Sequence, residues 1–470
     1  MTLLGHLPSL RHVSPDRIDR AVWPSTSAVD SAGRLCVGGV PLTDIADEFG
    51  TPSYVIDEAD FRYRIRHYRS ALPGVGVVYA GKSLLTTTVA QWVAEEGLGL
   101  DVCSPGELAV ALAAGVDPSL ILMHGNVKTV DELRDATAAA VGRMVVDSLT
   151  ELAHLACLVR RPQRVLLRVT PDIDIHGHRA VNTGVADQKF GFTLDDRQFS
   201  DAVDRISKHR LLTLVGLHCH LGSQITDATL YGEAIRRLVP AMADIQAHHG
   251  VTLGELNIGG GHGVPYLAGD PELDLRALSA TITEALDESC AVERFPRPAI
   301  VVEPGRAISA RAGVTVYRVQ TLKTRPGGRT FVAVDGGMSD NPRVALYGAK
   351  YSVALVNRHA PGPVKPVTIV GRHCEAGDEL ARDVLLPEDL HPGDVLAFAC
   401  TGAYNHSMAS TYNTTCRPPI VAVHHGDVRE LVRRETVADL LARDRGASQV
   451  RPRSPQPGST SGCAALLHGE

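Results

Sequence analysis

The stretch GVGVVYAGKSLL, residues 74–85, places a lysine directly after a run of apolar residues. The run has the length and the β-branched content of a buried strand. Lysine is mostly solvent-exposed in proteins, so a lysine at a strand end is by itself an ordinary surface residue. Lys82 becomes informative only through the residues that the rest of the chain places near it.

Seven more apolar runs of strand length follow between residues 50 and 310, and helical patterns such as PGELAVALAAGV separate most of them. This alternation indicates parallel strands joined by helical crossovers, and eight such units close a (β/α)₈ barrel. An open doubly wound sheet has the same alternation, but no GxGxxG motif follows the first strand, so we predict an α/β protein with a TIM barrel. The seven runs are LGLDVCS (98–104), LILMHGN (120–126), RMVVDS (143–148), RVLLRVT (164–170), LVGLHCHLGS (214–223), ELNIGGG (255–261) and AIVVEPGR (299–306).

The pattern changes after residue 310. Segments such as RTFVAVDGG and DVLAFAC are strand-like, and Gly/Pro turns rather than helical patterns separate them, which predicts a second, mainly β domain. The final residues are rich in Pro, Ser and Gly, as in disordered segments. We predict an N-terminal segment (1–45) that adds strands to the β domain, the barrel (46–310), the β domain (311–440) and a disordered tail (441–470).

Composition excludes several classes of protein. The 470 residues are 44% hydrophobic and 21% charged, as expected for a soluble globular chain of two or more domains. A net charge of -6 with interspersed signs argues against nucleic acid as a partner, and no apolar stretch is long enough to span a membrane. The N-terminus lacks the apolar core of a secretory signal, and nine cysteines without a CxxC pair form no disulfide framework, so we expect a cytoplasmic protein.

Every predicted barrel strand ends in polar residues or glycines. Barrel enzymes build their active sites at the C-terminal ends of the strands, so we expect these residues to converge on one face. Any one of them is compatible with a structural turn, but their joint occurrence predicts an active site. In chain order they are Lys82; Asp101 and Ser104; His124, Gly125 and Asn126; Asp147; Arg168; His218, His220, Gly222 and Ser223; Gly259, Gly260 and Gly261; and Glu303, Gly305 and Arg306.

Several strand-end residues have the chemistry of one cofactor site. A glycine triplet lets backbone N–H groups approach a phosphate, to which the Ser223 hydroxyl can add, and Arg306 can bind a phosphate or a carboxylate. Taken singly, a glycine triplet is more often a turn, and His220 is as readily a packed strand residue as a platform for a flat ring. Glu303 on an apolar strand needs a cationic partner, such as a protonated ring nitrogen. With the amine of Lys82, the set predicts a Schiff-base site for pyridoxal 5′-phosphate.

Ten segments carry a resemblance to a known family: YAGKS (79–83), DVCSPGELAVAL (101–112), HGNVK (124–128), DQKFGF (187–192), GLHCHLGSQI (216–225), LNIGGGHGVPY (256–266), EPGRAI (303–308), VDGGMSDNPRVALYGA (334–349), GRHCEAGD (371–378) and TGAYNHSMASTYN (401–413). In this order and spacing they resemble the fold-type III, alanine racemase-like, pyridoxal-dependent decarboxylases. Within that group the chain is most similar to the diaminopimelate decarboxylases of actinobacteria, over about residues 30 to 440.

The resemblance implies a role for each matching residue. The implied cofactor-binding residues are Lys82, Asp101, His220, Ser223, Gly260, Gly261, Glu303, Arg306 and Tyr404. The implied substrate-binding residues are Arg306, Arg343, Tyr347, Glu375 and Tyr404, and Lys82 and Cys374 are the implied catalytic pair. No metal ligand is implied. The family also implies a homodimer in which the loop of Cys374 reaches the cofactor of the neighbouring subunit.

The implied reaction is the decarboxylation of meso-2,6-diaminopimelate to L-lysine and CO₂, the last step of lysine biosynthesis. Decarboxylation leaves a carbanion that a protonated pyridine ring can absorb, and a thiol with a pKa near 8.5, such as that of Cys374, can return the proton. At the far end of the substrate, Arg306 and Arg343 would meet the carboxylate and Glu375 the ammonium group. Ornithine and arginine decarboxylases need only an anion there, because their substrates carry a lone distal cation.

Two other interpretations stay open. Another decarboxylase of this fold, acting on a D-amino acid or a carboxylated polyamine precursor, has the same cofactor site. The segment TYNTTCRPP (411–419) lacks an arginine expected after its YN pair, which bears on substrate preference, and His262 stands where the family usually has an apolar residue. A non-catalytic regulatory homologue is expected to lack Lys82 or Cys374, and both are present.

Overall fold

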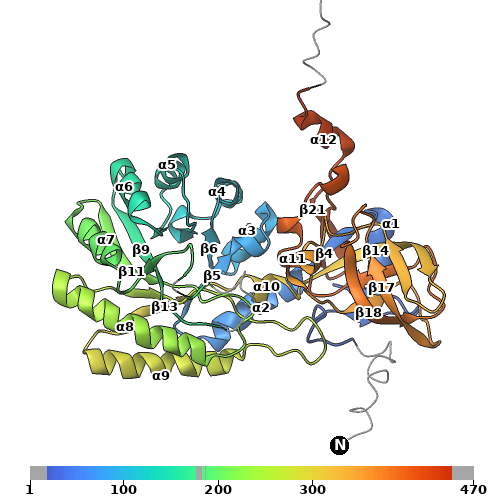
Figure 1. Ribbon diagram of the computed structural model, residues 1–470, viewed down its shortest axis with the longest axis horizontal. Coiled ribbons are helices and arrows are strands. Elements are labelled where there is room, and N and C mark those ends of the chain that lie inside the picture. Colours follow the sequence, from blue (N-terminus) through green and yellow to red (C-terminus); the bar gives the residue numbers. More distant parts are fainter. Residues whose placement is uncertain (1–17, 176–182, 186, 447–470) are drawn as a thin grey trace, which may run out of the picture.

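The computed structural model describes residues 18–175, 183–185 and 187–446. A barrel ringed by helices lies beside a smaller domain built mainly from strands (Figure 1). Within these ranges, no helix combines the length and the apolar character that crossing a membrane requires.

Eight parallel strands close the barrel, because β8 pairs with β9 and β13 pairs with β5. Each lies within or overlaps one of the eight apolar runs, so the predicted (β/α)₈ barrel is confirmed. A two-residue strand, β10 (Phe192–Thr193), pairs in parallel with the last two residues of β9. The barrel strands are β5 (Gly76–Ala80), β6 (Gly99–Val102), β7 (Ile121–Met123), β8 (Arg143–Val146), β9 (Gln163–Thr170), β11 (Leu212–His218), β12 (Glu255–Asn257) and β13 (Ala299–Val302).

Helices cover the outside of the barrel, and several begin at a serine or threonine that caps them. Thr86, Ser104, Thr129 and Ser148 each accept a hydrogen bond from the backbone N–H three residues on. Ser104 is therefore a helix cap, and its position at a strand end has a structural explanation. The helices are α2 (Glu58–Ala71), α3 (Thr87–Glu95), α4 (Pro105–Ala113), α5 (Val130–Ala139), α6 (Leu149–Leu158), α7 (Arg197–Lys208), α8 (Thr229–His249) and α9 (Leu275–Glu293).

The barrel interior is apolar along the middle of the strands and polar at their C-terminal ends. Met123 and Val146 belong to the core between strands and helices, whereas Leu122, Val145 and Leu166 form a separate small cluster. Since successive strand residues face opposite sides, this second cluster lies inside the barrel. It fills the interior beneath the polar residues at the strand ends, so the barrel is a packed support for the site.

The second domain is a sheet in the order β18-β17-β15-β14-β4-β20-β21, with β19 pairing to both β14 and β16. β4 runs antiparallel to β14 and parallel to β20, so it belongs to this sheet although it lies beyond the predicted boundary at residue 46. A short apolar strand followed at once by α2 has the pattern of a barrel unit, which explains the difference. The strands are β4 (Ser53–Asp57), β14 (Gly313–Thr324), β15 (Thr330–Val334), β16 (Val353–Leu355), β17 (Val364–Val370), β18 (Glu379–Pro387), β19 (Val395–Phe398), β20 (Ile420–His424) and β21 (Asp427–Val432).

The chain ends also differ in detail from the expectation. β1 (Ala28–Val29), β2 (Leu35–Val37) and β3 (Val40–Pro41) form their own three-stranded sheet, followed by α1 (Leu42–Glu48). Their apolar residues share a core with β4, β14, β19 and β20, so this segment packs on the β domain. The predicted tail begins inside α12 (Val437–Arg443), and its residues 447–470 lie outside the described ranges, as do residues 1–17.

Three shorter elements bring the β domain against the barrel's polar face: α10 (Arg306–Ser309), which leads from β13 into β14, α11 (Arg343–Tyr347) and the turn η6 (His406–Met408). The backbone N–H of Tyr404 donates to the carbonyl of Ser83 at 2.8 Å, so the β domain contacts the barrel next to Lys82.

Candidate active site

A cavity of about 760 Å³ lies at the C-terminal face of the barrel, between the barrel and the β domain. Nine of the thirteen predicted site residues line it. They are Lys82, His220, Ser223, Gly261, Glu303, Arg306, Arg343, Tyr347 and Tyr404. The other four do not line the cavity in this chain: Gly260 precedes Gly261, Asp101 lies near His124, and Cys374 and Glu375 are on a separate loop.

Lys82 sits in the turn η3 (Gly81–Ser83), immediately after β5. Its side chain is exposed to the cavity, although the surrounding protein partly desolvates the amine. Gly81 is required here, since a Cβ would lie 2.8 Å from the carbonyl oxygen of Asp101. Burial opposes ionisation of Lys82, but the neighbouring Tyr404 and Asp101 outweigh it and raise the pKa of the amine. An amine is thus placed at the cavity wall by the end of a strand.

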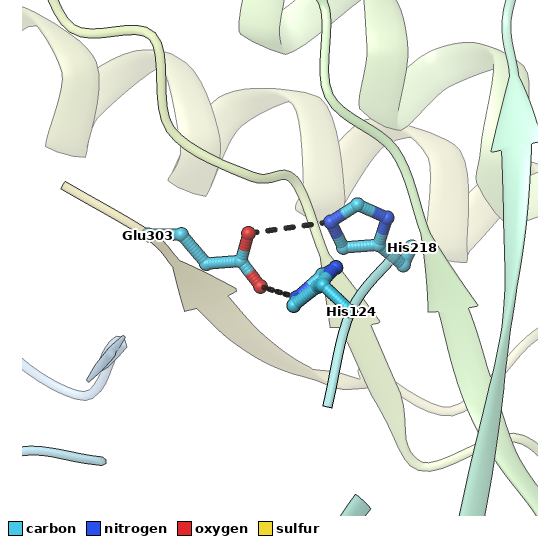
Figure 2. Close-up of side chains that lie close together, drawn as sticks. All are labelled: His124, His218 and Glu303. Carbon is cyan, nitrogen blue, oxygen red and sulfur yellow. Dashed lines mark hydrogen bonds and ion pairs between the residues drawn. The ribbon is translucent and has the colours of Figure 1, made fainter. Parts of the chain in front are cut away.

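Glu303 follows β13 and is held by side chains from three other strand ends; two of these side chains, His124 and His218, are drawn in Figure 2. His124 Nε2 lies 2.9 Å from Oε1, and His218 Nε2 lies 3.3 Å from Oε2. Asn257 donates from Nδ2 to Oε1 at 2.7 Å. Burial would raise the pKa of Glu303, but the two histidines lower it well below its usual value. Glu303 is therefore a buried, oriented carboxylate at the cavity wall.

The pKa values of the two histidines shift in opposite directions. Burial lowers the pKa of His218 to about 4, so its imidazole is neutral at pH 7. Burial also acts on His124, but Asp101, with Oδ1 3.9 Å from Nε2, and Glu303 raise its pKa. Burial raises the pKa of Asp101 itself to about 6. Two imidazoles and a carboxylate can ligate a divalent cation, but here hydrogen bonds among them already use the same atoms.

The glycine triplet forms a concave stretch of backbone beside His220. A Cβ on Gly260 would lie 2.1 Å from the carbonyl oxygen of Glu303, and one on Gly261 would lie 2.1 Å from that of Gly222. Gly261 also has a φ of +91°, which disfavours any other residue. The N–H of Gly260 donates to Nδ1 of His220 at 3.2 Å, and burial lowers the pKa of that imidazole far below its usual value. A neutral ring thus lies against backbone that only glycine can form.

Two arginines, Arg306 and Arg343, form part of the cavity wall. Arg306 donates from NH2 to Oγ of Ser223 at 3.1 Å, and its guanidinium lies 4.7 Å from the ring centroid of Tyr404. Arg343 is buried and donates from NH1 to the hydroxyl of Tyr351 at 2.7 Å. No ion pair found among the described residues includes Arg306 or Arg343. Two cations without a carboxylate partner make this wall suitable for anionic groups of a ligand.

Cys374 and Glu375 occupy an exposed but well-anchored loop between β17 and β18. The His373 ring is within hydrogen-bond distance of Ser339 Oγ (2.8 Å) and Asn413 Oδ1 (3.0 Å). Glu375 accepts a hydrogen bond from the hydroxyl of Tyr412 at 2.7 Å. The loop therefore holds a thiol and a carboxylate on the surface of this chain.

Sequence reasoning missed some residues of the site. His124 and His218 stand out as strand-end residues but receive no role, while Asn257, Tyr266 and Tyr351 are not singled out at all. Asn257 ends β12 two residues before the triplet, a position that resembles the other strand ends. The structure also explains His262, which departs from the family: it is buried between two aromatic rings, stacked on that of Tyr68.

Burial lowers the pKa of His262 to about 3, so it packs as a neutral ring. An imidazole that remains neutral can replace the apolar residue usual at this position without bringing a charge into the core.

Comparison with known proteins agrees with this geometry. Residues 58–310 match the family model described as pyridoxal-dependent decarboxylase, pyridoxal binding domain. The chain is 51% identical over 444 residues to the diaminopimelate decarboxylase of Actinosynnema pretiosum subsp. auranticum, covering 94% of this chain and 100% of the relative. It is 44% identical to that of Mycobacterium tuberculosis, covering 92% and 98%. The crystal structure of the M. jannaschii diaminopimelate decarboxylase in complex with L-lysine superposes with a TM-score of 0.83 at 29% identity, covering 90% of this chain and 98% of that one. On this match of sequence and fold along nearly its whole length, the chain belongs to the diaminopimelate decarboxylase family of pyridoxal-dependent decarboxylases.

Proposed function

We propose that this chain catalyses the decarboxylation of meso-2,6-diaminopimelate to L-lysine and CO₂ with pyridoxal 5′-phosphate as cofactor. The observation that carries the proposal is one cavity that joins the amine of Lys82, the oriented carboxylate of Glu303 and two arginines without carboxylate partners. Relatives named diaminopimelate decarboxylase, at 40% to 51% identity, support it.

The residues present fit the cofactor. When bound, pyridoxal 5′-phosphate supplies a conjugated ring that takes up the electron pair left by the departing CO₂. Lys82 would bind its aldehyde carbon, and Ser223 with the backbone of Gly260 and Gly261 would hold its phosphate. The triplet supports this assignment because a Cβ at either glycine would collide with backbone oxygens. No side chain therefore covers the backbone at this point.

Glu303 would keep the cofactor's ring nitrogen protonated. Its carboxylate is fixed from one side by His124, His218 and Asn257, and it lines the cavity. A preoriented charge of this kind needs no reorganisation during the reaction. The neutral His220 ring would stack against the cofactor without repelling a cationic nitrogen.

The part of the wall formed by Arg306 and Arg343 would select the substrate. Arg306 and Arg343 would bind the carboxylate at the end of diaminopimelate that does not react, with Tyr347 beside them and Tyr404 between cofactor and substrate. A D-lysine or polyamine-precursor decarboxylase would leave both guanidinium groups without an anion in a mostly buried site, which is unfavourable. The paired arginines therefore favour diaminopimelate over these alternatives.

Cys374 and Glu375 would come from a second copy of the chain. Both are exposed and outside the cavity of their own subunit, although the loop that carries them is anchored by His373. In a two-fold dimer each loop can enter the other subunit's cavity, and the two sites are then equivalent. There the Cys374 thiol would donate the proton that replaces CO₂, and Glu375 would bind the distal ammonium group.

The test is direct. Purified protein with pyridoxal 5′-phosphate is incubated with meso-diaminopimelate and, separately, with ornithine, arginine and D-lysine, and amine products and CO₂ are measured. We expect lysine and CO₂ from diaminopimelate alone, and borohydride reduction followed by peptide mapping should locate the pyridoxyl group on Lys82. Faster release of CO₂ from any of the other three substrates would contradict the proposal.

A further inference from the structure

Tyr266 connects the two arginines of the substrate wall. Its hydroxyl oxygen accepts a hydrogen bond from NH1 of Arg306 at 2.6 Å and another from NH1 of Arg343 at 2.9 Å. The Arg343 guanidinium also lies 4.9 Å from the centroid of the Tyr266 ring, a cation–π distance. Two like charges that share one acceptor lie within two hydrogen-bond lengths of each other, so this oxygen sets their spacing.

The tyrosine also joins the two domains at this point. Arg306 follows a barrel strand, whereas Arg343 begins α11 in the β domain. Tyr266 belongs to the barrel loop between β12 and α9, and its backbone carbonyl accepts hydrogen bonds from the backbone N–H (3.2 Å) and the hydroxyl (3.0 Å) of Ser352 in the β domain. Its hydroxyl is therefore fixed relative to both arginines.

The O–H of Tyr266 has to donate its hydrogen bond to a group other than the two arginines. A guanidinium group has no acceptor, so the phenol cannot donate to Arg306 or Arg343. None of the hydrogen bonds found among the described residues has this hydroxyl as its donor. Tyr266 lines the cavity, where a ligand oxygen can accept the proton.

We propose that Tyr266 is a specificity-determining residue of the distal end of the substrate site: its oxygen holds Arg306 and Arg343 at the spacing of one carboxylate, and its O–H donates to that carboxylate. The inference deepens the proposed function, on which it rests, by adding a neutral donor to two cationic ones. Three converging donors distinguish a substrate that ends in a carboxylate from one that ends in an amine alone.

A comparison of L-lysine with cadaverine tests whether Tyr266 recognises the distal carboxylate or supports ligand binding in general. Lysine keeps the carboxylate and ammonium of the unreacted end of diaminopimelate, and cadaverine is the same molecule without the carboxylate. The experiment measures the dissociation constants of both ligands from changes in the absorbance of the bound cofactor. It compares wild-type holoenzyme with Tyr266→Phe and Tyr266→Met, each first checked for bound pyridoxal 5′-phosphate.

We expect both variants to bind lysine about 10- to 100-fold more weakly, the range for a lost hydrogen bond to a charged group, while cadaverine affinity stays the same. The KM for diaminopimelate should rise by a similar factor with kcat largely kept. Tyr54→Phe is the matched control, because it removes a buried tyrosine hydroxyl that donates to the backbone carbonyl of Asp340, away from the cavity. It should leave the lysine-to-cadaverine ratio unchanged.

Tyr351→Phe tests whether the effect requires the tyrosine that contacts both arginines or follows from the loss of any hydrogen-bond partner of Arg343. The Tyr351 hydroxyl accepts from Arg343 alone of the two arginines. The Tyr351→Phe variant should reduce lysine affinity less than Tyr266→Phe does. An unchanged lysine-to-cadaverine ratio in Tyr266→Phe, an equal loss for both ligands, or an equal effect of Tyr351→Phe would overturn the inference. A wild-type enzyme that does not act on diaminopimelate would instead overturn the proposed function, so the two failures are distinguishable.

Discussion

The Glu303 cluster and the Cys374 loop are both well anchored, yet only Glu303 lies at the cavity of its own chain. Glu303 is buried, and three side chains from separate strand ends fix both of its oxygens. Cys374 is exposed, with its loop held in place by His373, and it does not line the cavity that contains Glu303. This difference supports the proposal that one chain forms the cofactor half of the site and a second copy supplies the proton donor.

The largest effect in the buried half is expected from Glu303→Gln. The amide keeps the size of the side chain but cannot hold a ring nitrogen protonated, so kcat should fall by about 30- to 1000-fold while the cofactor stays bound. The measurement is steady-state turnover of diaminopimelate together with the absorption spectrum of the holoenzyme. A near-normal rate in this variant would remove the glutamate from the mechanism.

Arg343→Ala should have a smaller and more selective effect. The variant removes one of two cations facing the distal carboxylate, so kcat/KM for diaminopimelate should fall by about 10- to 100-fold. A substrate without that carboxylate should be affected much less. Arg382→Ala, which changes an exposed arginine of the same domain paired with Glu379, is the control. Equal losses on both kinds of substrate would mean that Arg343 has a structural role.

The smallest effect concerns stability. The pKa of His218 is about 4 in the folded chain and 6.5 in a model peptide. Between these values the unfolded chain binds a proton at His218 that the folded chain does not. The contribution of neutral His218 to the free energy of unfolding is therefore fully present above pH 6.5 and is lost as the pH falls toward 4. His218→Gln should remove about 2 kcal/mol of the stability difference between pH 7 and pH 5.

Urea unfolding of both proteins at the two pH values, with saturating cofactor, measures this difference. His154→Gln is the control, since His154 is exposed on α6. If wild type and His218→Gln lose the same stability on acidification, His218 is not buried in the neutral form.

The sequence predicts the barrel well because most residues of its strands are buried, so that the strands read as apolar runs. β4 is harder to place, since a strand followed directly by a helix has the same local pattern whichever sheet it joins. Its partners β14 and β20 lie hundreds of residues away, and pairing at that distance leaves no local signal.

The residues of the site also differ in how well the sequence predicts them. Lys82 and Glu303 stand out because each is a charged residue directly after an apolar strand, where burial is costly unless the charge has a partner. The partners of Glu303 do not stand out, because His124 and His218 come near it only when the barrel closes, across 179 and 85 residues of sequence. The roles of Cys374 and Glu375 follow from the family resemblance alone, since nothing in the local sequence of an exposed loop says which molecule it will contact.

The most direct test of a shared site mixes two inactive variants. Lys82→Ala and Cys374→Ala should each be nearly inactive alone, because each lacks one half of every site. After subunit exchange, verified by co-purification of differently tagged chains, half of the dimers are mixed, and each mixed dimer has one site with neither substitution. Activity should then return to roughly a quarter of wild type, as two-fold symmetry requires. If the subunits exchange and no activity returns, each site is built within one chain and the account is contradicted.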